Sequence, residues 1–195
     1  MPRESLLVAA REVIREMGYS EANLEAIAAR ARIPLAAVKA EFPDKARLLD
    51  ALLRANSPLP DLEAALDAVQ GDTAEDLLRD AMRKVAAALQ RHEDFFELAV
   101  IDAQVNNGAF LSSLSAELFP KANALLGRVK ATKQTRPVMD MVFARTLIAL
   151  LIGFIISDRA VPGVARTAMH LFPQRAWLDG MIDLLLYGVL EDDAR

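Results

Sequence analysis

Apolar residues recur three and four residues apart along almost the whole chain, and this periodicity restricts the fold more than any other feature. Residues at that spacing lie on one face of an α-helix. The first such run consists of Leu6, Ala10, Val13, Ile14 and Met17, and Gly18 ends it. No segment shows the alternation of apolar and polar residues that is typical of a half-buried strand. The sequence therefore predicts an all-α fold.

Capping residues and prolines divide this pattern into separate helices. Asn23 is typical of an N-cap and Pro34 of a first helical position, so short helices should begin at these points. The segment NSPLP at 56–60 is the clearest linker. Longer helices are expected behind it, over Thr73 to about Arg91, Phe95–Val105, Leu114 to about Lys130 with Pro120 inside, Pro137 to about Ser157, and 175–190.

Composition narrows the class of protein. With 53% hydrophobic and 26% charged residues, the chain can form a packed core. It contains no cysteine, which excludes disulfides and fits a reducing cytoplasm. The longest apolar run, Leu147–Ile156, is too short for a bilayer span of about 20 residues. We therefore expect a cytoplasmic protein without a membrane partner.

The distribution of charge distinguishes the front of the chain from the rear. The net charge is −4, but residues 1–55 hold nine Lys/Arg and eight Asp/Glu, which gives +1. The remaining residues hold fourteen and nineteen, which gives −5. Only the front of the chain is therefore suited to meeting a polyanion such as DNA.

Residues for catalysis or metal binding are scarce. His92 and His170 are the only histidines, and without cysteine a metal site would need carboxylates to complete it. Ser112 and Ser113 have no base placed to activate them, and the chain has no glycine-rich phosphate loop. We expect no enzymatic activity, no cofactor and no metal.

Three short helices are predicted in the first 42 residues, with a tight break between the second and the third. This arrangement is a candidate helix-turn-helix, although a plain three-helix bundle has the same spacing. The segment LLVAAREVIREMGYSEANLEAIAARARIPLAAVKAEFPDKARLLDALL resembles the N-terminal domain of TetR-family transcriptional regulators. The matching residues are Ala9-Ala10, Gly18-Tyr19, Ile27-Ala28, Ile33, Val38, Phe42-Pro43, Lys45 and Leu48-Leu49, and the resemblance covers residues 5 to 53.

The resemblance implies a DNA-binding domain over residues 1–46 and a helical effector-binding and dimerisation domain over residues 47–195. Several contact residues depart from the family pattern. Arg32 replaces the usual turn glycine and would need a left-handed backbone, at a cost of about 1 kcal/mol. Lys39 replaces the tyrosine that touches phosphate. Glu41 brings a negative charge, which pairing with Lys45 would partly neutralise.

The predicted recognition helix offers few base-reading groups. Leu35, Ala36 and Ala37 can touch thymine methyl groups but cannot form bidentate hydrogen bonds with bases. The family pattern places phosphate contacts at Lys39 and Lys45, whereas other cations in the domain are ordinary surface charges on the simplest interpretation. The predicted DNA-binding residues are Arg32, Leu35, Ala36, Lys39 and Lys45.

Aromatic and methionine residues of the rear domain are most simply explained as core, but together they can line an apolar effector pocket. Arg145, one turn before the longest apolar run, would reach solvent, pair with Asp140 or Asp102, or meet an anionic ligand. By analogy with the family, the predicted ligand-binding residues are Phe96, Gln104, Phe110, Met139, Phe143, Arg145 and Trp177.

Two helical segments, Pro137–Ser157 and 181–190, are apolar on nearly all faces. A helix buried on one side needs an apolar stripe of only about 100°. The surplus apolar surface predicts a two-fold homodimer with a four-helix bundle, in which Gly153 and Gly180 allow close approach.

Two functions fit the sequence. The first is a TetR-type regulator, a repressor, that binds operator double-stranded DNA as a homodimer and releases it when a small apolar effector binds. The alternative is a TetR-like dimer that binds a small molecule or lipid and has lost DNA binding. Arg32, Glu41 and the Leu-Ala-Ala helix start favour the alternative, whereas Lys39, Lys45 and the intact helix framework favour the regulator.

Overall fold

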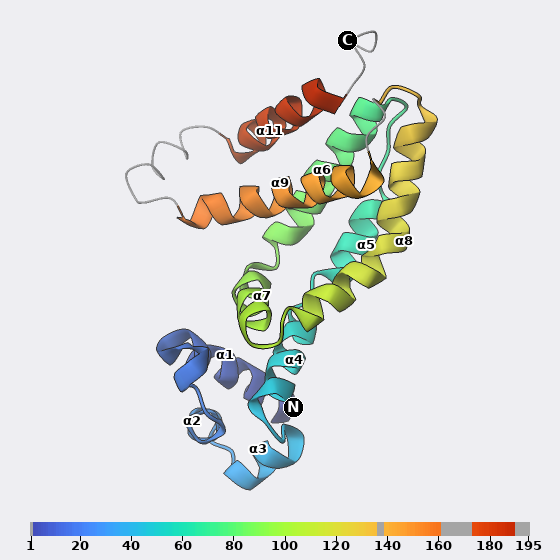
Figure 1. Ribbon diagram of the computed structural model, residues 1–195. Helices are drawn as coiled ribbons and strands as arrows, with labels where there is room; N and C mark the ends of the chain where they lie inside the picture. Colours follow the sequence, from blue (N-terminus) through green and yellow to red (C-terminus); the bar gives the residue numbers. More distant parts are fainter. Residues whose placement is uncertain (1, 136–138, 161–172, 190–195) are drawn as a thin grey trace. The chain divides into compact units, whose positions relative to one another are not determined.

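The computed structural model describes residues 2–135, 139–160 and 173–189 (Figure 1). These residues form helices joined by short loops and include no β-strand, which confirms the predicted all-α fold. No helix in the described ranges is both long enough and apolar enough to cross a membrane. The chain divides into two compact units, each built from two stretches of sequence. Unit 1 comprises Met1–Ser57 and His92–Ser115, and unit 2 comprises Pro58–Arg91 and Ala116–Arg195.

Unit 1 is built around the N-terminal helices. Helix α1 packs against α2 and α4, α2 packs against α3, and α4 also packs against α7. The core of this domain includes Leu6, Ala10, Val13, Ile27, Val38 and Phe42, all of which are buried. The helices are α1 (Pro2–Glu21), α2 (Leu24–Ala31), α3 (Leu35–Glu41), α4 (Lys45–Ala55) and α7 (Glu93–Val105).

Helix α1 departs from the predicted end at Gly18. Gly18 has φ 82° and ψ 156°, a conformation that glycine adopts readily, and a further helical turn follows to Glu21. Met17, which the periodicity placed on the apolar face, is 47% exposed because it immediately precedes this kink. Asn23 then caps α2 as predicted, since its Oδ1 accepts a hydrogen bond from Ala26 N at 2.8 Å.

Unit 2 is organised around α6, against which α5, α9 and α11 pack. Its helices are α5 (Leu59–Asp67), α6 (Ala74–Gln90), the part of α8 (Ala109–Ala131) from Ala116 onward, α9 (Asp140–Ala160) and α11 (Gln174–Val189). Helix α5 is absent from the sequence-based prediction, because Pro58 and Pro60 are typical of a linker. Both prolines lie at the helix start, where the absent N–H has no intrahelical acceptor to lose.

Two other helices in the rear half of the sequence differ from their predicted bounds. Helix α8 begins at Ala109, five residues before the predicted Leu114, and runs through Pro120 without ending there. Helix α9 continues to Ala160, beyond the predicted Ser157. Its predicted first residue, Pro137, lies outside the described residues.

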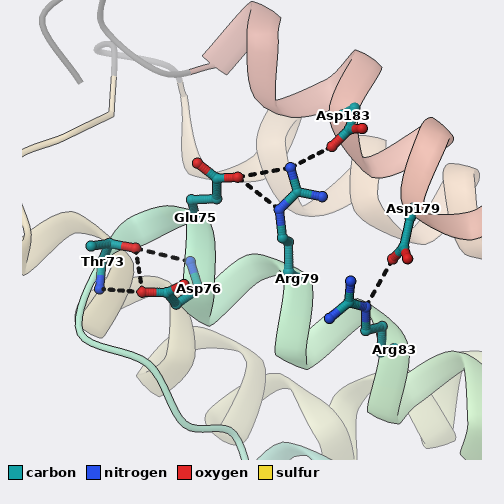
Figure 2. Close-up of polar contacts among 7 residues, drawn as sticks. All are labelled: Thr73, Glu75, Asp76, Arg79, Arg83, Asp179 and Asp183. Atoms are coloured by element: carbon teal, nitrogen blue, oxygen red, sulfur yellow. Dashed lines mark hydrogen bonds and ion pairs between the residues drawn. The ribbon is translucent and has the colours of Figure 1, made fainter. Parts of the chain in front are cut away.

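Helix α6 is fixed at its start by a capping box and along its side by ion pairs with α11 (Figure 2). Thr73 Oγ1 accepts a hydrogen bond from Asp76 N at 3.0 Å. Arg79 bridges Glu75 and Asp183, and Arg83 Nε donates to Asp179 Oδ1 at 2.8 Å.

These ion pairs form a ladder, because the two arginines are four residues apart on α6 and the two aspartates are four residues apart on α11. The pairing order is reversed between the helices, which makes them antiparallel. Partial burial lowers the pKa of Arg79, but the hydrogen bonds that its guanidinium donates to Asp183 and Glu75 outweigh this effect, and the net shift is upward.

Candidate functional site

The turn between α2 and α3 depends on the backbone of Arg32. Its φ of 57° and ψ of 40° confirm the left-handed conformation expected there. Arg32 N donates to Ala29 O at 3.2 Å, and Ile33 N donates to Ala28 O at 3.0 Å, so two of the last four carbonyls of α2 have a partner in the turn. The exposed guanidinium of Arg32 has no hydrogen bond or ion pair to any part of the chain that the structure describes.

Helix α3 presents short side chains to solvent. Val38 is its buried residue, Leu35 is half-buried, and Ala36 and Lys39 are exposed. Pro34 forms the N-cap without a side-chain hydrogen bond, as its chemistry requires. Lys39 Nζ lies 3.5 Å from the carboxylate of Glu25, and both side chains are more than half exposed. Such a pair is weak, and its lysine is easily released to another anion.

Glu41 does not pair with Lys45, contrary to the sequence-based expectation. Its Oε1 lies 3.5 Å from Arg3 Nε. Pairing at i,i+4 requires one continuous helix, but α3 ends at Glu41 and α4 begins at Lys45. The guanidinium of Arg3 also lies 5.8 Å from the centre of the Phe42 ring.

Lys45 connects the end of α1 to the start of α4. Its ammonium donates to the carbonyl oxygens of Tyr19 at 2.6 Å, Ser20 at 3.1 Å and Ala22 at 2.9 Å. It also lies 4.4 Å from the centre of the Tyr19 ring. Burial, and to a smaller extent the charge of Asp44, raise the pKa of Tyr19. The phosphate contact assigned to Lys45 stays a prediction, and the ammonium already has three acceptors.

Among the other cations of residues 3–55, some form an ion pair with a carboxylate and some do not. Arg47 is exposed, and its side chain has no partner among the residues described. Its backbone N–H donates to Asp44 Oδ1, the N-cap of α4, at 2.7 Å. Paired cations are Arg11 and Arg15 with Asp94, Arg30 with Glu12 and Glu16, and Arg54 with Asp50. The hydrogen bond from Arg30 lowers the pKa of Glu16.

Three predicted ligand-binding residues belong to unit 1. Phe96 and Phe110 are half-buried, and both rings contact the buried Phe95, with centroid distances of 5.9 Å and 6.1 Å. The guanidinium of Arg54 lies 5.7 Å from the centre of the Phe110 ring. Gln104 is exposed. Phe96 and Phe110 therefore both pack against Phe95, a residue that was not among the predicted ligand-binding residues.

The other four predicted ligand-binding residues belong to unit 2. Phe143 is buried, Met139 and Trp177 are 73% and 42% exposed, and Arg145 is exposed. Asp140 pairs with Lys130 and not with Arg145. Within the described part of unit 2, Arg145 has no ion pair. Since the predicted residues are divided between the two units, a single pocket lined by all seven stays a prediction.

Asp102, the other predicted partner of Arg145, is buried and serves the α7–α8 turn of unit 1. Its Oδ2 accepts a hydrogen bond from Phe110 N at 3.0 Å, and its Oδ1 accepts one from Asn106 Nδ2 at 3.2 Å. The carboxylate therefore caps the first turn of α8.

Helix α11 has two apolar faces. Leu178, Ile182 and Leu186, spaced four residues apart, are buried. The opposite face comprises Trp177, Gly180, Leu184 and Tyr187, and its large side chains are 42%, 79% and 59% exposed in chain order. We call these four residues the α11 outer stripe.

Helix α9 has a corresponding stripe. Met141, Ile148 and Ile152 are 78%, 56% and 43% exposed, and their spacing of seven and four residues places them on one face. Added Cβ atoms at Gly153 and Gly180 would meet no atom within 4 Å. The described parts of the chain thus leave apolar surface uncovered on both helices, as the sequence predicted.

Metal ligands do not gather in the described residues, which contain no group of three or more His, Asp or Glu that could hold an ion. His92 precedes α7, and its Nδ1 lies 3.2 Å from Asn56 O. His170 lies outside the described residues.

Comparison with known proteins points to one family. Residues 6–52 match the family described as "Bacterial regulatory proteins, tetR family". No curated protein sequence matches the chain. Solved structures match it along nearly all of its length, and neither they nor the family match indicate an enzyme.

Three of these structures illustrate the likeness. SmeT, the repressor of the Stenotrophomonas maltophilia multidrug efflux pump SmeDEF, is 22% identical with a TM-score of 0.67, over 99% of this chain and 92% of SmeT. NalD, the secondary repressor of the Pseudomonas aeruginosa MexAB-OprM pump, is 22% identical with a TM-score of 0.68, over 98% of both chains. The TetR-family regulator PfmR from Thermus thermophilus is 21% identical with a TM-score of 0.66, over 91% of this chain and 97% of PfmR. SmeT is also known as a complex with triclosan.

Proposed function

From the match of residues 6–52 to the tetR family, we propose that this chain is a transcriptional repressor that binds operator DNA as a homodimer and leaves it when a small apolar effector binds. The observation that carries the proposal is the α2–turn–α3 arrangement, which holds α3 by Val38 and leaves Ala36 and Lys39 exposed. A helix held in this way can enter a major groove.

The outer faces of α9 and α11 support the homodimer. Both faces carry exposed large apolar side chains, and a two-fold pairing of the two helices with their copies would cover them in a four-helix bundle. A dimer also presents two copies of α3, which a palindromic operator requires.

The similar structures suggest the chemistry of the effector. SmeT binds triclosan, a small apolar compound, and both SmeT and NalD repress multidrug efflux pumps. We assign effector contacts in unit 1 to Phe96, Gln104 and Phe110, and in unit 2 to Met139, Phe143, Arg145 and Trp177. Binding that prefers the DNA-free state would release the operator.

The direct test is fluorescence anisotropy of the purified protein with a labelled duplex taken from upstream of its own coding sequence. We expect tight binding at low salt, binding that weakens with added salt, and a preference over a scrambled duplex of equal composition. Triclosan, used as the apolar probe, should raise the dissociation constant for the specific duplex. The control is the variant Val38→Asp. It should lose DNA binding, because a buried carboxylate at this position would displace α3 from the core of the domain.

The second candidate, a dimeric small-molecule or lipid carrier without DNA binding, is favoured by the exposed face of α3. Ala36, Ala37 and Ala40 offer no hydrogen bonds to bases, and Glu41 adds a negative charge. Absence of salt-dependent binding to either duplex, together with binding of an apolar probe, would establish this alternative instead.

A further inference from the structure

We infer that Arg32 and Arg47 are the residues that hold DNA phosphates on either side of α3, and that Lys45 is a structural link within the domain. This inference rests on the proposed DNA binding. It changes the assignment of the phosphate contact in the first turn of α4 from Lys45, which the family pattern indicates, to Arg47, which that pattern does not.

The cations of the N-terminal helices differ in whether their side chains are free. Residues 3–55 contain nine Lys and Arg, and only Arg32 and Arg47 have no partner in the described chain. Each of the others has a partner. The pairs are Arg3 with Glu41, Arg11 and Arg15 with Asp94, Arg30 with Glu12 and Glu16, Lys39 with Glu25, Arg54 with Asp50, and Lys45 with three carbonyls. A paired cation must break its pair before it neutralises a phosphate, whereas Arg32 and Arg47 need not.

The two free guanidinium groups are attached on opposite sides of α3 in the sequence. Arg32 lies in the turn just before α3, and Arg47 lies in the first turn of the helix that follows it. Helix α3 has seven residues, and at 1.5 Å per residue it is about 10 Å long. The major groove is about 12 Å wide. A cation at each end of α3 therefore suits the two phosphate backbones that border the groove.

Lys45, in contrast, is already held within the domain. An ammonium has three donors, and all three are used on the carbonyls of Tyr19, Ser20 and Ala22. Reaching a phosphate would withdraw them from these carbonyls and from the Tyr19 ring. Arg47, two residues later, can form two parallel hydrogen bonds to a phosphate without disturbing the domain.

The experiment measures the slope of log K against log salt for a mixed-sequence duplex. It compares wild type with Arg32→Gln, Arg47→Gln and Lys45→Gln. The matched control is Arg54→Gln, which removes the same charge from α4 at a position held by Asp50. Thermal melting followed by circular dichroism accompanies each variant, so that folding is measured apart from binding.

We expect Arg32→Gln and Arg47→Gln each to reduce the magnitude of the slope by about 0.9 per phosphate contact, or about 2 per homodimer. Lys45→Gln should lower the melting temperature and, at temperatures where it is folded, keep the wild-type slope. Arg54→Gln should keep the wild-type slope.

The inference is overturned if Lys45→Gln reduces the slope while Arg47→Gln keeps it. It is also overturned if Arg54→Gln reduces the slope as much as Arg47→Gln, because general charge would then explain the effect. If wild type shows no salt-dependent DNA binding, the proposed function fails and the inference fails with it. If wild type binds DNA and all four variants keep its slope, the inference is overturned but the proposed function is not.

Discussion

Arg32 occupies a backbone conformation that suits glycine better than arginine. A left-handed residue with a Cβ costs about 1 kcal/mol, and φ is 57° here. We expect Arg32→Gly to raise the free energy of unfolding by about 0.5–1 kcal/mol, because relief of this strain exceeds the entropy that glycine gains in the unfolded chain. Urea denaturation measures the change. Arg32→Ala, which keeps the strain, is the control, and an equal gain in both variants would contradict the explanation.

Phe42 closes the core of the N-terminal helices. It is 3% exposed and lies between the end of α3 and the start of α4. Phe42→Ala should lower the free energy of unfolding by about 3–5 kcal/mol, since it leaves a cavity as well as losing apolar burial. The control is Val8→Ala on α1, where the side chain is 44% exposed and the loss should be small. Calorimetric melting distinguishes the two, and a loss below about 1 kcal/mol for Phe42→Ala would place its ring outside the core.

At the scale of the element, the ion-pair ladder sets how α11 lies on α6. Arg79→Asp places a carboxylate beside Glu75 and Asp183 and should lower the free energy of unfolding by roughly 1–2 kcal/mol. The value is modest because the Asp183 side chain is 41% exposed. The double variant Arg79→Asp with Asp183→Arg restores opposite charges and should recover most of the loss.

A matched control exists within the same unit. Arg91 lies 3.4 Å from Asp61, and both side chains are well exposed, so Arg91→Asp should cost less than about 0.5 kcal/mol. Chemical denaturation at low and high salt gives the comparison. If the swapped pair on α6 and α11 is no more stable than Arg79→Asp alone, the ladder does not hold α11.

At the scale of the whole molecule, burial within one protomer separates interface positions from core positions. Leu184, on the α11 outer stripe, is 79% exposed, whereas Leu151 on α9 is only 8% exposed. We expect Leu184→Glu to give a folded monomer, because the charge lies at the proposed interface. Leu151→Glu should unfold the protein, because the charge would be buried without a partner.

Sedimentation velocity and circular dichroism together test this expectation. Wild type should sediment as a dimer at micromolar concentration, and Leu184→Glu should sediment as a monomer with an unchanged helical spectrum. Wild type sedimenting as a monomer would contradict the homodimer. A dimeric Leu184→Glu variant would instead remove the α11 outer stripe from the interface.

Much of the local structure was determined by the sequence, because neighbouring residues decide it. Asn23 and Thr73 cap the helices that follow them because their side-chain oxygens reach backbone N–H groups only three residues away. The burial of Val38 and Phe42 follows from helical periodicity in the same way. The left-handed turn at Arg32 was also predictable, because the resemblance identified the position as one usually occupied by glycine.

Only the tertiary structure decided which partner each charge takes. Glu41 and Lys45 have the spacing of a helical pair, but a break between α3 and α4 separates them, and they bind Arg3 and the end of α1 instead. A charged side chain has several partners within reach along the sequence, and the choice depends on which helices pack together. Helix packing also decides that the side chain of Arg47 stays free and that α11 has one buried and one exposed apolar face. Neither feature could therefore be predicted from the sequence.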